Sequence, residues 1–316
     1  MRRLFKYGMS VVLATALIGT ATAADYPTRP ITFMTMTQPG AQIDRLTRGL
    51  GQRMSKILGQ PINVKNVTGS HGTVMATSLS RAKADGYTIG VTSLTAYTYA
   101  PHHAKMQYKP EDFDYLTLVA LNSSGFIAKS DKPYNTLKEA FAWAKNKNGG
   151  KMRAMFHGAD DKDAIVRMAK KEGVQLALLP SKGGPSVIQA VTGGHVDVGY
   201  VGAILYKHVE AGTIKLIAAA LGDRLPAKDT KNVPTLKEQG YDEQIEMIVA
   251  LVAPKGLDPK AKARLLAAAN KLAADGETQT FITKNLKMRP VKWGELTADK
   301  TAKDLYDAFG KLAAAK

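Results

Sequence analysis

Three turns in this chain combine small residues, hydroxyl groups and glycine at the start of a helical pattern. They span residues 37–44, 68–73 and 181–186, and each follows a short extended apolar run. The first turn of a helix leaves backbone N–H groups without intrahelical partners, and the helix dipole adds partial positive charge there. Such a turn binds a carboxylate or a phosphate without a charged side chain. The residues therefore predict an anion-binding protein.

Alternating strands and helices position these turns. Residues 31–35, 62–64 and 87–92 are typical of strands, and residues 43–57 and 74–84 show the apolar spacing of the helices between them. The second half of the chain repeats the order of strand, glycine turn and helix. This order predicts βαβ units with parallel pairing and right-handed crossovers. The expected fold is α/β, with mixed, mostly parallel sheets flanked by helices.

The order of elements also indicates two lobes. We expect the chain to cross to a second lobe near residues 121–125 and to return near residues 246–251. Lobe 1 then comprises residues 25–122 plus 248–316, and lobe 2 comprises residues 123–247. A ligand is expected in the cleft between the lobes.

The first 23 residues read as a secretory signal peptide. Arg2, Arg3 and Lys6 form a basic segment, residues 11–18 an apolar segment, and residues 21–23 a small-residue cleavage site. An uncleaved anchor is the alternative, but the apolar segment is too short for a membrane span of about 20 residues. The expected location is the periplasm.

Composition excludes several classes of protein. The chain has 316 residues and no cysteine, which excludes a thiol nucleophile, a cysteine zinc site and an iron–sulfur cluster. The net charge of +17 is spread over lysine-rich surfaces without the interleaved aromatics of a nucleic-acid site. We therefore expect no nucleic-acid partner, no cofactor and no metal, and we expect a monomer.

An ordered set of short motifs resembles the periplasmic receptors of tripartite tricarboxylate transporters, the family of the Bordetella uptake gene (Bug) products. The resemblance covers the whole mature chain. The motifs are Tyr26-Pro27-Thr28-Arg29-Pro30-Ile31, Gln38-Pro39-Gly40-Ala41-Gln42-Ile43-Asp44, Leu58-Gly59-Gln60-Pro61, Lys65-Asn66, Asp85-Gly86-Tyr87-Thr88, Lys182-Gly183, Gly193-Gly194 with Val196-Asp197, and Val233-Pro234-Thr235.

The resemblance implies a type II solute-binding protein, with two α/β lobes that close on a small carboxylate and deliver it to a membrane permease. Backbone amides of the first-helix loop and of a loop in the second lobe are expected to hold the ligand. Carried over to this chain, the ligand-binding residues are Gln38, Pro39, Gly40, Ala41, Gln42, Ile43, His71, Thr73, Ser93, Thr95, His157, Gly158, Ala159, Asp160, Ser181, Lys182, Gly183 and Tyr200.

Departures from the family pattern bear on the ligand. Ala41 replaces a loop glycine, Ile43 replaces a threonine and predicts an apolar wall, and His71 replaces a glycine. Val201 stands where amino-acid-binding members carry an aspartate that meets an ammonium. The expected ligand is therefore an amine-free mono- or dicarboxylate, with an aromatic one left open.

Several residues also have ordinary structural interpretations. Asp44 is expected as an acid in the first turn of a helix, and Asp160 and Asp161 as helix caps rather than metal ligands. His102 and His103 lie in a proline-bearing loop that we expect to face solvent. Gly40 is expected to let the ligand approach the backbone closely.

Two other functions stay open. An exported hydrolase is disfavoured because the sequence has neither a Gly-x-Ser-x-Gly elbow nor a His-Glu-x-x-His motif. A periplasmic sensor domain would use the same closing lobes as a transport receptor. We expect a binding protein rather than an enzyme.

Overall fold

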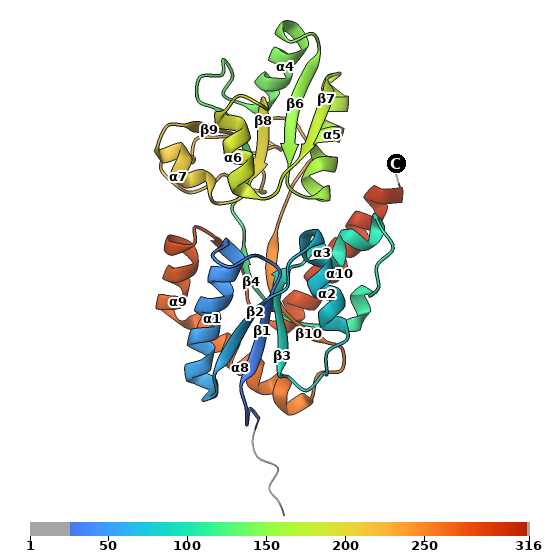
Figure 1. The fold of residues 1–316 in the computed structure, drawn as a ribbon, viewed down its shortest axis with the longest axis vertical. Helices are drawn as coiled ribbons and strands as arrows, with labels where there is room; N and C mark the ends of the chain where they lie inside the picture. Colours follow the sequence, from blue (N-terminus) through green and yellow to red (C-terminus); the bar gives the residue numbers. More distant parts are fainter. Residues whose placement is uncertain (1–25, 315–316) are drawn as a thin grey trace, which may run out of the picture.

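The structure, a computed structural model, describes residues 26–314, so the expected signal peptide lies outside the described residues. Figure 1 shows two lobes joined by extended segments. The sheet of the first lobe has the strand order β11-β4-β10-β3-β1-β2. Its strands are β1 (Ile31–Thr35), β2 (Ile62–Asn66), β3 (Thr88–Ser93), β4 (Phe113–Leu121), β10 (Ile248–Pro254) and β11 (Arg289–Pro290).

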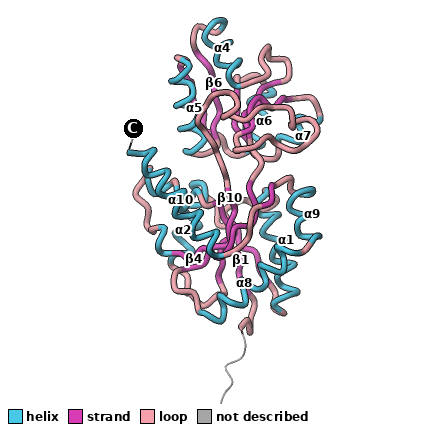
Figure 2. The backbone as a smooth tube through the Cα atoms, turned by 180° about the vertical axis from the view of Figure 1, so that it is seen from behind, coloured by secondary structure: helices cyan, strands magenta, loops and turns pink. Residues whose placement is uncertain are grey.

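Helices cover both faces of this sheet, as Figures 1 and 2 show. In β10, Val249 and Leu251 belong to one apolar cluster, whereas Ala250 and Val252 belong to another. This alternation follows from the two-residue period of a strand and requires cover on both sides. One face carries α1 (Gln42–Leu58), α8 (Pro259–Ala274), α9 (Gly276–Thr280) and the turn η4 (Phe281–Asn285), and the other carries α2 (Thr73–Ser80), α3 (Thr95–Thr98) and α10 (Glu295–Ala314).

The second lobe repeats the plan on a sheet of order β7-β6-β8-β5-β9. Its strands are β5 (Gly125–Lys129), β6 (Lys151–Phe156), β7 (Gln175–Pro180), β8 (Val198–Val201) and β9 (Ile214–Ala219). Its helices are α4 (Leu137–Lys147), α5 (Ala159–Glu172), α6 (Gly184–Thr192) and α7 (Leu205–Glu210). The predicted two-lobed α/β fold is confirmed.

Both sheets are mixed, as expected, but the expectation of mostly parallel pairing is wrong. The pairs β1–β2, β1–β3, β6–β7 and β6–β8 are parallel. The pairs β10–β3, β10–β4, β11–β4, β5–β8 and β5–β9 are antiparallel. The reason is topological. Strands β5 and β10 are entered from the other lobe rather than through a helix crossover, so they run against their neighbours.

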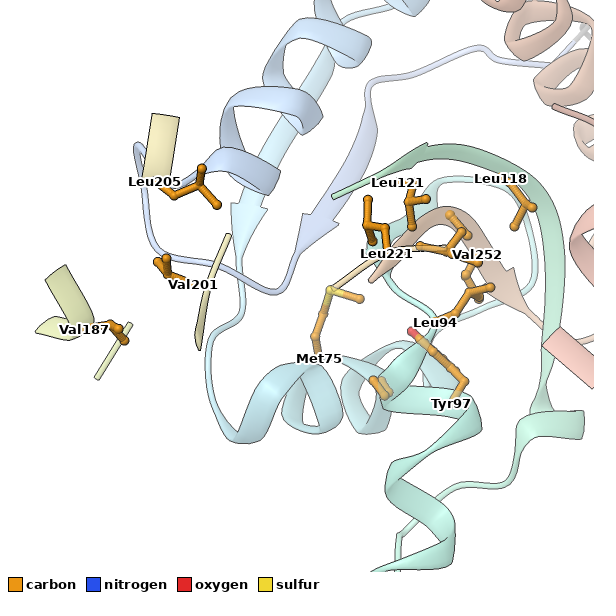
Figure 3. Close-up of a cluster of buried hydrophobic side chains, with 14 of the residues drawn as sticks. Met75, Leu94, Tyr97, Leu118, Leu121, Val187, Val201, Leu205, Leu221 and Val252 are labelled. Atoms are coloured by element: carbon orange, nitrogen blue, oxygen red, sulfur yellow. The ribbon is translucent and has the colours of Figure 1, made fainter. Parts of the chain in front are cut away.

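Two segments connect the lobes, residues 122–124 and residues 220–247. They contact each other where Asn122 N–H donates to the Met247 carbonyl at 2.9 Å. Figure 3 shows Leu121, which precedes the first segment, and Leu221, which belongs to the second, in one buried cluster with Leu94 and Val252. We propose that the lobe boundaries follow these connections, at residues 122 and 248, because strand membership changes there.

Local sequence signals explain most element ends. Gly59 ends α1 in the left-handed conformation, with φ 75°. The Asp258 side chain caps α8 by accepting from Ala261 N–H at 2.9 Å. The helix expected to reach residue 84 ends at Ser80 instead. Within residues 26–314, no helix combines the length and apolarity that a membrane crossing requires.

Candidate functional site

The loop between β1 and α1 is held by the side chain of Asp44. Its carboxylate accepts from Gly40 N–H at 2.8 Å, Asn66 Nδ2 at 2.8 Å and Arg48 Nε at 3.0 Å. Burial by itself raises the pKa of Asp44, but these hydrogen bonds outweigh it and hold the pKa below its ordinary value. The ionised carboxylate of Asp44 therefore holds this loop in place. Its position in the first turn of α1 is the one that the sequence predicts.

The hydrogen bonds of Asp44 determine which backbone N–H groups of the loop remain free for a ligand. Gly40 N–H is taken by Asp44, and Ala41 N–H donates to the Gln38 carbonyl at 3.1 Å. The next amides, of Gln42 and Ile43, begin α1, and Ala41 offers them no side-chain cap. These two N–H groups at a helix N-terminus are the candidate carboxylate donors.

One expectation for this loop is wrong, and another stays a prediction. Gly40 has φ +83°, which favours glycine, and a Cβ there would meet nothing within 4 Å. Close approach of the ligand to the Gly40 backbone stays a prediction. Ile43 is 4% exposed and packs in the core with Leu46 and Leu50, so its side chain forms no cleft wall. The side chain of Gln42 is also occupied, because its Nε2 donates to the Leu286 carbonyl at 2.7 Å.

The second lobe builds its loop in the same way. Asp161, in the first turn of α5, accepts from His157 N–H at 2.7 Å and from Gly158 N–H. The side chain of Asp161 is buried, and Asp160 is half-buried beside it. Burial raises the pKa of Asp160, and burial together with the Asp160 carboxylate raises the pKa of Asp161. Asp161 is thus a helix cap, as expected, and it occupies two of the backbone donors assigned to the ligand.

The loop after β7 lies against the same histidine. Ser181 Oγ is 3.1 Å from His157 Nδ1, so the hydroxyl orients the imidazole ring. Lys182 N–H donates to Ser186 Oγ at 3.0 Å, and the Lys182 side chain is exposed. Gly183 has φ +126°, which favours glycine at this turn. This loop therefore contributes mainly side chains to the cleft.

The third turn brings a residue of lobe 1 to the same place. His71, in the turn η1 (Ser70–Gly72), lies with its ring centroid 5.5 Å from that of His157. The two histidines come from opposite lobes, 86 positions apart in the sequence. The Thr73 hydroxyl instead donates to the Ser70 carbonyl at 3.0 Å. The structure thus brings together His71 of lobe 1 and His157 and Ser181 of lobe 2.

Three other predicted residues lie deeper. Ser93 Oγ and Thr95 Oγ1 are hydrogen-bonded to each other at 2.8 Å, and Ser93 is fully buried. Tyr200 is 4% exposed, and its hydroxyl donates to Ser124 Oγ at 2.9 Å. Burial raises the pKa of Tyr200 well above its ordinary value. These hydroxyl groups already have protein partners.

The sequence analysis missed a direct contact between the lobes. The hydroxyl of Tyr99 donates to Asp163 Oδ2 at 2.5 Å, with the Ala159 carbonyl 3.2 Å away. His103 Nε2 lies 3.4 Å from the same Asp163 oxygen. The loop is exposed at His103, as expected, but His102 is half-buried, so the expectation that it faces solvent is wrong for that residue. His102 Nε2 is 2.9 Å from the Tyr306 carbonyl on α10.

A second contact between the lobes is an ion pair. Arg289 Nη2 in β11 is 2.7 Å from Asp223 Oδ2, in the segment that returns from lobe 2. Neither contact has a local sequence signal, because its partners are far apart in the chain.

In the described part of the chain, no group of three or more His, Asp or Glu side chains is arranged to hold a metal ion.

Comparison with known proteins agrees with this architecture. The family model described as "Tripartite tricarboxylate transporter family receptor" matches residues 46–312. The chain belongs to this receptor family. The receptor is 33% identical over 268 residues to the UPF0065 protein in the gbd 5' region of Cupriavidus necator, covering 82% of this chain and 81% of that protein. It is 28% identical over 268 residues to Protein BugT of Bordetella pertussis, covering 80% and 79%.

Solved structures share the fold of the receptor. The periplasmic binding protein BugD superposes with a TM-score of 0.78 at 24% identity, covering 91% of this chain and 97% of that chain. MatC from Rhodopseudomonas palustris, solved with bound malate, superposes with a TM-score of 0.78 at 22% identity and covers 91% and 100%. An R. palustris protein with adipate gives a TM-score of 0.80 at 19% identity and covers 92% and 98%. At these identities the similarity establishes the fold.

Proposed function

We propose that the receptor binds a small organic carboxylate between its lobes and delivers it to the permease of a tripartite tricarboxylate transporter. The observation that carries this proposal is the meeting of His71 and His157 from opposite lobes at 5.5 Å, beside two helix N-termini. Malate and adipate in related structures support a carboxylate as the ligand class. We propose that the protein acts as a monomer in the periplasm and catalyses no reaction.

The ligand sites in this proposal lie on both lobes. The N–H groups of Gln42 and Ile43 hold one carboxylate at α1, and the residues around His157 close over it from lobe 2. A ligand that binds both lobes shifts the population towards the closed form, because only that form satisfies donors on both sides. The permease then distinguishes the loaded receptor by its closed shape.

A thermal-shift screen combined with small-angle scattering tests the proposal. A carboxylate at a hundred times its dissociation constant is expected to stabilise the fold by about 2.7 kcal/mol. The same ligand is expected to lower the radius of gyration towards the value of the closed form, whereas sugars and free amino acids are expected to change neither quantity. If no mono-, di- or tricarboxylate raises the unfolding temperature, the proposed function is wrong.

The contact between Tyr99 and Asp163 gives a separate prediction. Tyr99→Phe removes a hydrogen bond to a charged group, worth about 1.5–3 kcal/mol, and keeps the ring. The variant is expected to open the lobes in the absence of ligand and to weaken carboxylate binding about tenfold. Small-angle scattering and calorimetry measure the two effects.

Tyr306→Phe on α10 is the matched control, because its ring packs against His102 within lobe 1. It is expected to behave as the parent protein. An unchanged radius and affinity in Tyr99→Phe would show that this contact does not hold the lobes together.

A further inference from the structure

The pair of histidines from opposite lobes predicts a more specific ligand than a carboxylate in general. This inference rests on the proposed function. The ring planes of His71 and His157 are tilted by 32°. His71 is exposed and His157 is half-buried, so neither ring is part of an apolar core. Paired imidazoles that are open to a ligand can both donate to an oxyanion once they are protonated.

The ring of His157 and the backbone of His71 are each constrained. Ser181 Oγ engages Nδ1 of His157, which leaves Nε2 as the nitrogen that can meet a ligand. His71 has φ 51° and follows Ser70 with φ 43°, two consecutive non-glycine residues in the left-handed region. This conformation costs roughly 1–2 kcal/mol per residue, and such strain is concentrated at functional sites.

The surroundings of His157 favour its neutral form when no ligand is bound. Burial lowers the pKa of His157, and the neighbouring His71 lowers that pKa further. From α5, Asp160 and Asp161 face the pair, and Tyr200 lies behind them. The neighbouring loop contributes Lys182. A bound carboxylate adds negative charge between the rings and favours their protonated forms.

We propose that His71 and His157 together bind the second carboxylate of a dicarboxylate ligand and take up a proton from solvent when they do so. The first carboxylate lies at the α1 N-terminus, and the imidazole pair distinguishes a dicarboxylate from a monocarboxylate of the same length. Because binding takes up a proton, dicarboxylate affinity rises as the pH falls through the range in which the imidazoles titrate.

Calorimetry with succinate, glutarate and adipate, each paired with the monocarboxylate of equal chain length, tests this inference. Titration at one pH in two buffers of different ionisation enthalpy measures the protons taken up. We expect an uptake of about one proton for the preferred dicarboxylate and a smaller one for its monocarboxylate, with affinity rising up to about tenfold per pH unit.

His71→Gln and His157→Gln are each expected to lower dicarboxylate affinity about tenfold, to lower monocarboxylate affinity by much less and to reduce the proton uptake. His195→Gln is the matched control, since His195 is an exposed histidine of lobe 2. Dicarboxylate binding without proton uptake, with both variants equal to the parent, would overturn the inference and leave the proposed function standing. Failure of every carboxylate to bind would overturn the proposed function itself.

Discussion

Asp44→Ala is expected to lower the free energy of unfolding by about 3 kcal/mol and carboxylate affinity by at least about tenfold. The carboxylate of Asp44 is 1% exposed and joins the cleft loop to β2 through Asn66. Its removal takes away the acceptor of the Gly40 N–H, of Arg48 Nε and of Asn66 Nδ2, which keeps only the Thr37 carbonyl. A hydrogen bond to a charged group contributes about 1.5–3 kcal/mol. The affinity falls because the loop before the α1 N-terminus loses the hydrogen bonds that hold it in place.

Chemical denaturation and calorimetry with the best carboxylate of the screen measure these two effects. Asp304→Ala is the control, because Asp304 is an exposed acid that pairs with Lys300 on α10. It is expected to change stability by no more than about 0.5 kcal/mol. If Asp44→Ala binds the ligand as tightly as the parent protein, the first-helix loop is not the carboxylate site.

Asp197→Asn is expected to destabilise the protein by about 2 kcal/mol at pH 7. The Asp197 side chain is 1% exposed and accepts from Lys132 Nζ at 2.9 Å, Arg153 Nη2 at 2.9 Å and Arg153 N–H at 2.9 Å. Burial raises the pKa of Asp197, but the bonds from Arg153 and Lys132 outweigh it and lower the pKa from 3.8 to about 2. Each pKa unit corresponds to about 1.36 kcal/mol, which sets the size of the effect.

The contribution of Asp197 to the free energy of unfolding changes with pH in a defined direction. A carboxyl group whose pKa is depressed in the folded protein contributes its full stability above the unfolded value of 3.8. That contribution is lost as the pH falls through about 2. The difference in stability between parent and Asp197→Asn is therefore expected to be constant above about pH 5 and to shrink by about half near pH 3.

Urea denaturation at pH 7, 5 and 3 measures this difference. Asp131→Asn is the matched control, since Asp131 follows β5, the strand paired with β8, but pairs with Lys129 while 65% exposed. It is expected to change stability by less than about 0.5 kcal/mol at each pH. A destabilisation by Asp197→Asn that stays constant down to pH 3 would assign its effect to packing rather than to charge.

Periodic apolar spacing predicted the helices and strands well, and α1 shows why. Ile43, Leu46 and Leu50 recur at helical spacing, and Gly59 follows as the left-handed cap. Both signals act within a few residues, so no tertiary information is needed. The direction of the strands was predicted less well, because β5 and β10 pair according to how the chain passes between the lobes.

Local sequence patterns also predicted only part of the candidate site. The sequence located the loops at Gly40, His71, His157 and Ser181, but it did not show which of their donors are already used. Asp161 takes the N–H groups of His157 and Gly158, a choice that depends on the side-chain rotamer and on burial. Asp197 stood out only as part of a family motif, and its role required Arg153 from β6 and Lys132 from the turn after β5.

The sequence by itself determined the family and the α/β order of elements, because these depend on local spacing, turn chemistry and ordered motifs. Only the tertiary structure decided that His71 meets His157, that Tyr99 contacts Asp163 and that Ile43 lies in the core. The physical reason is that such contacts join residues from distant segments. They exist only when two lobes, each folded on its own sheet, come together, and a local pattern carries no information about that distance.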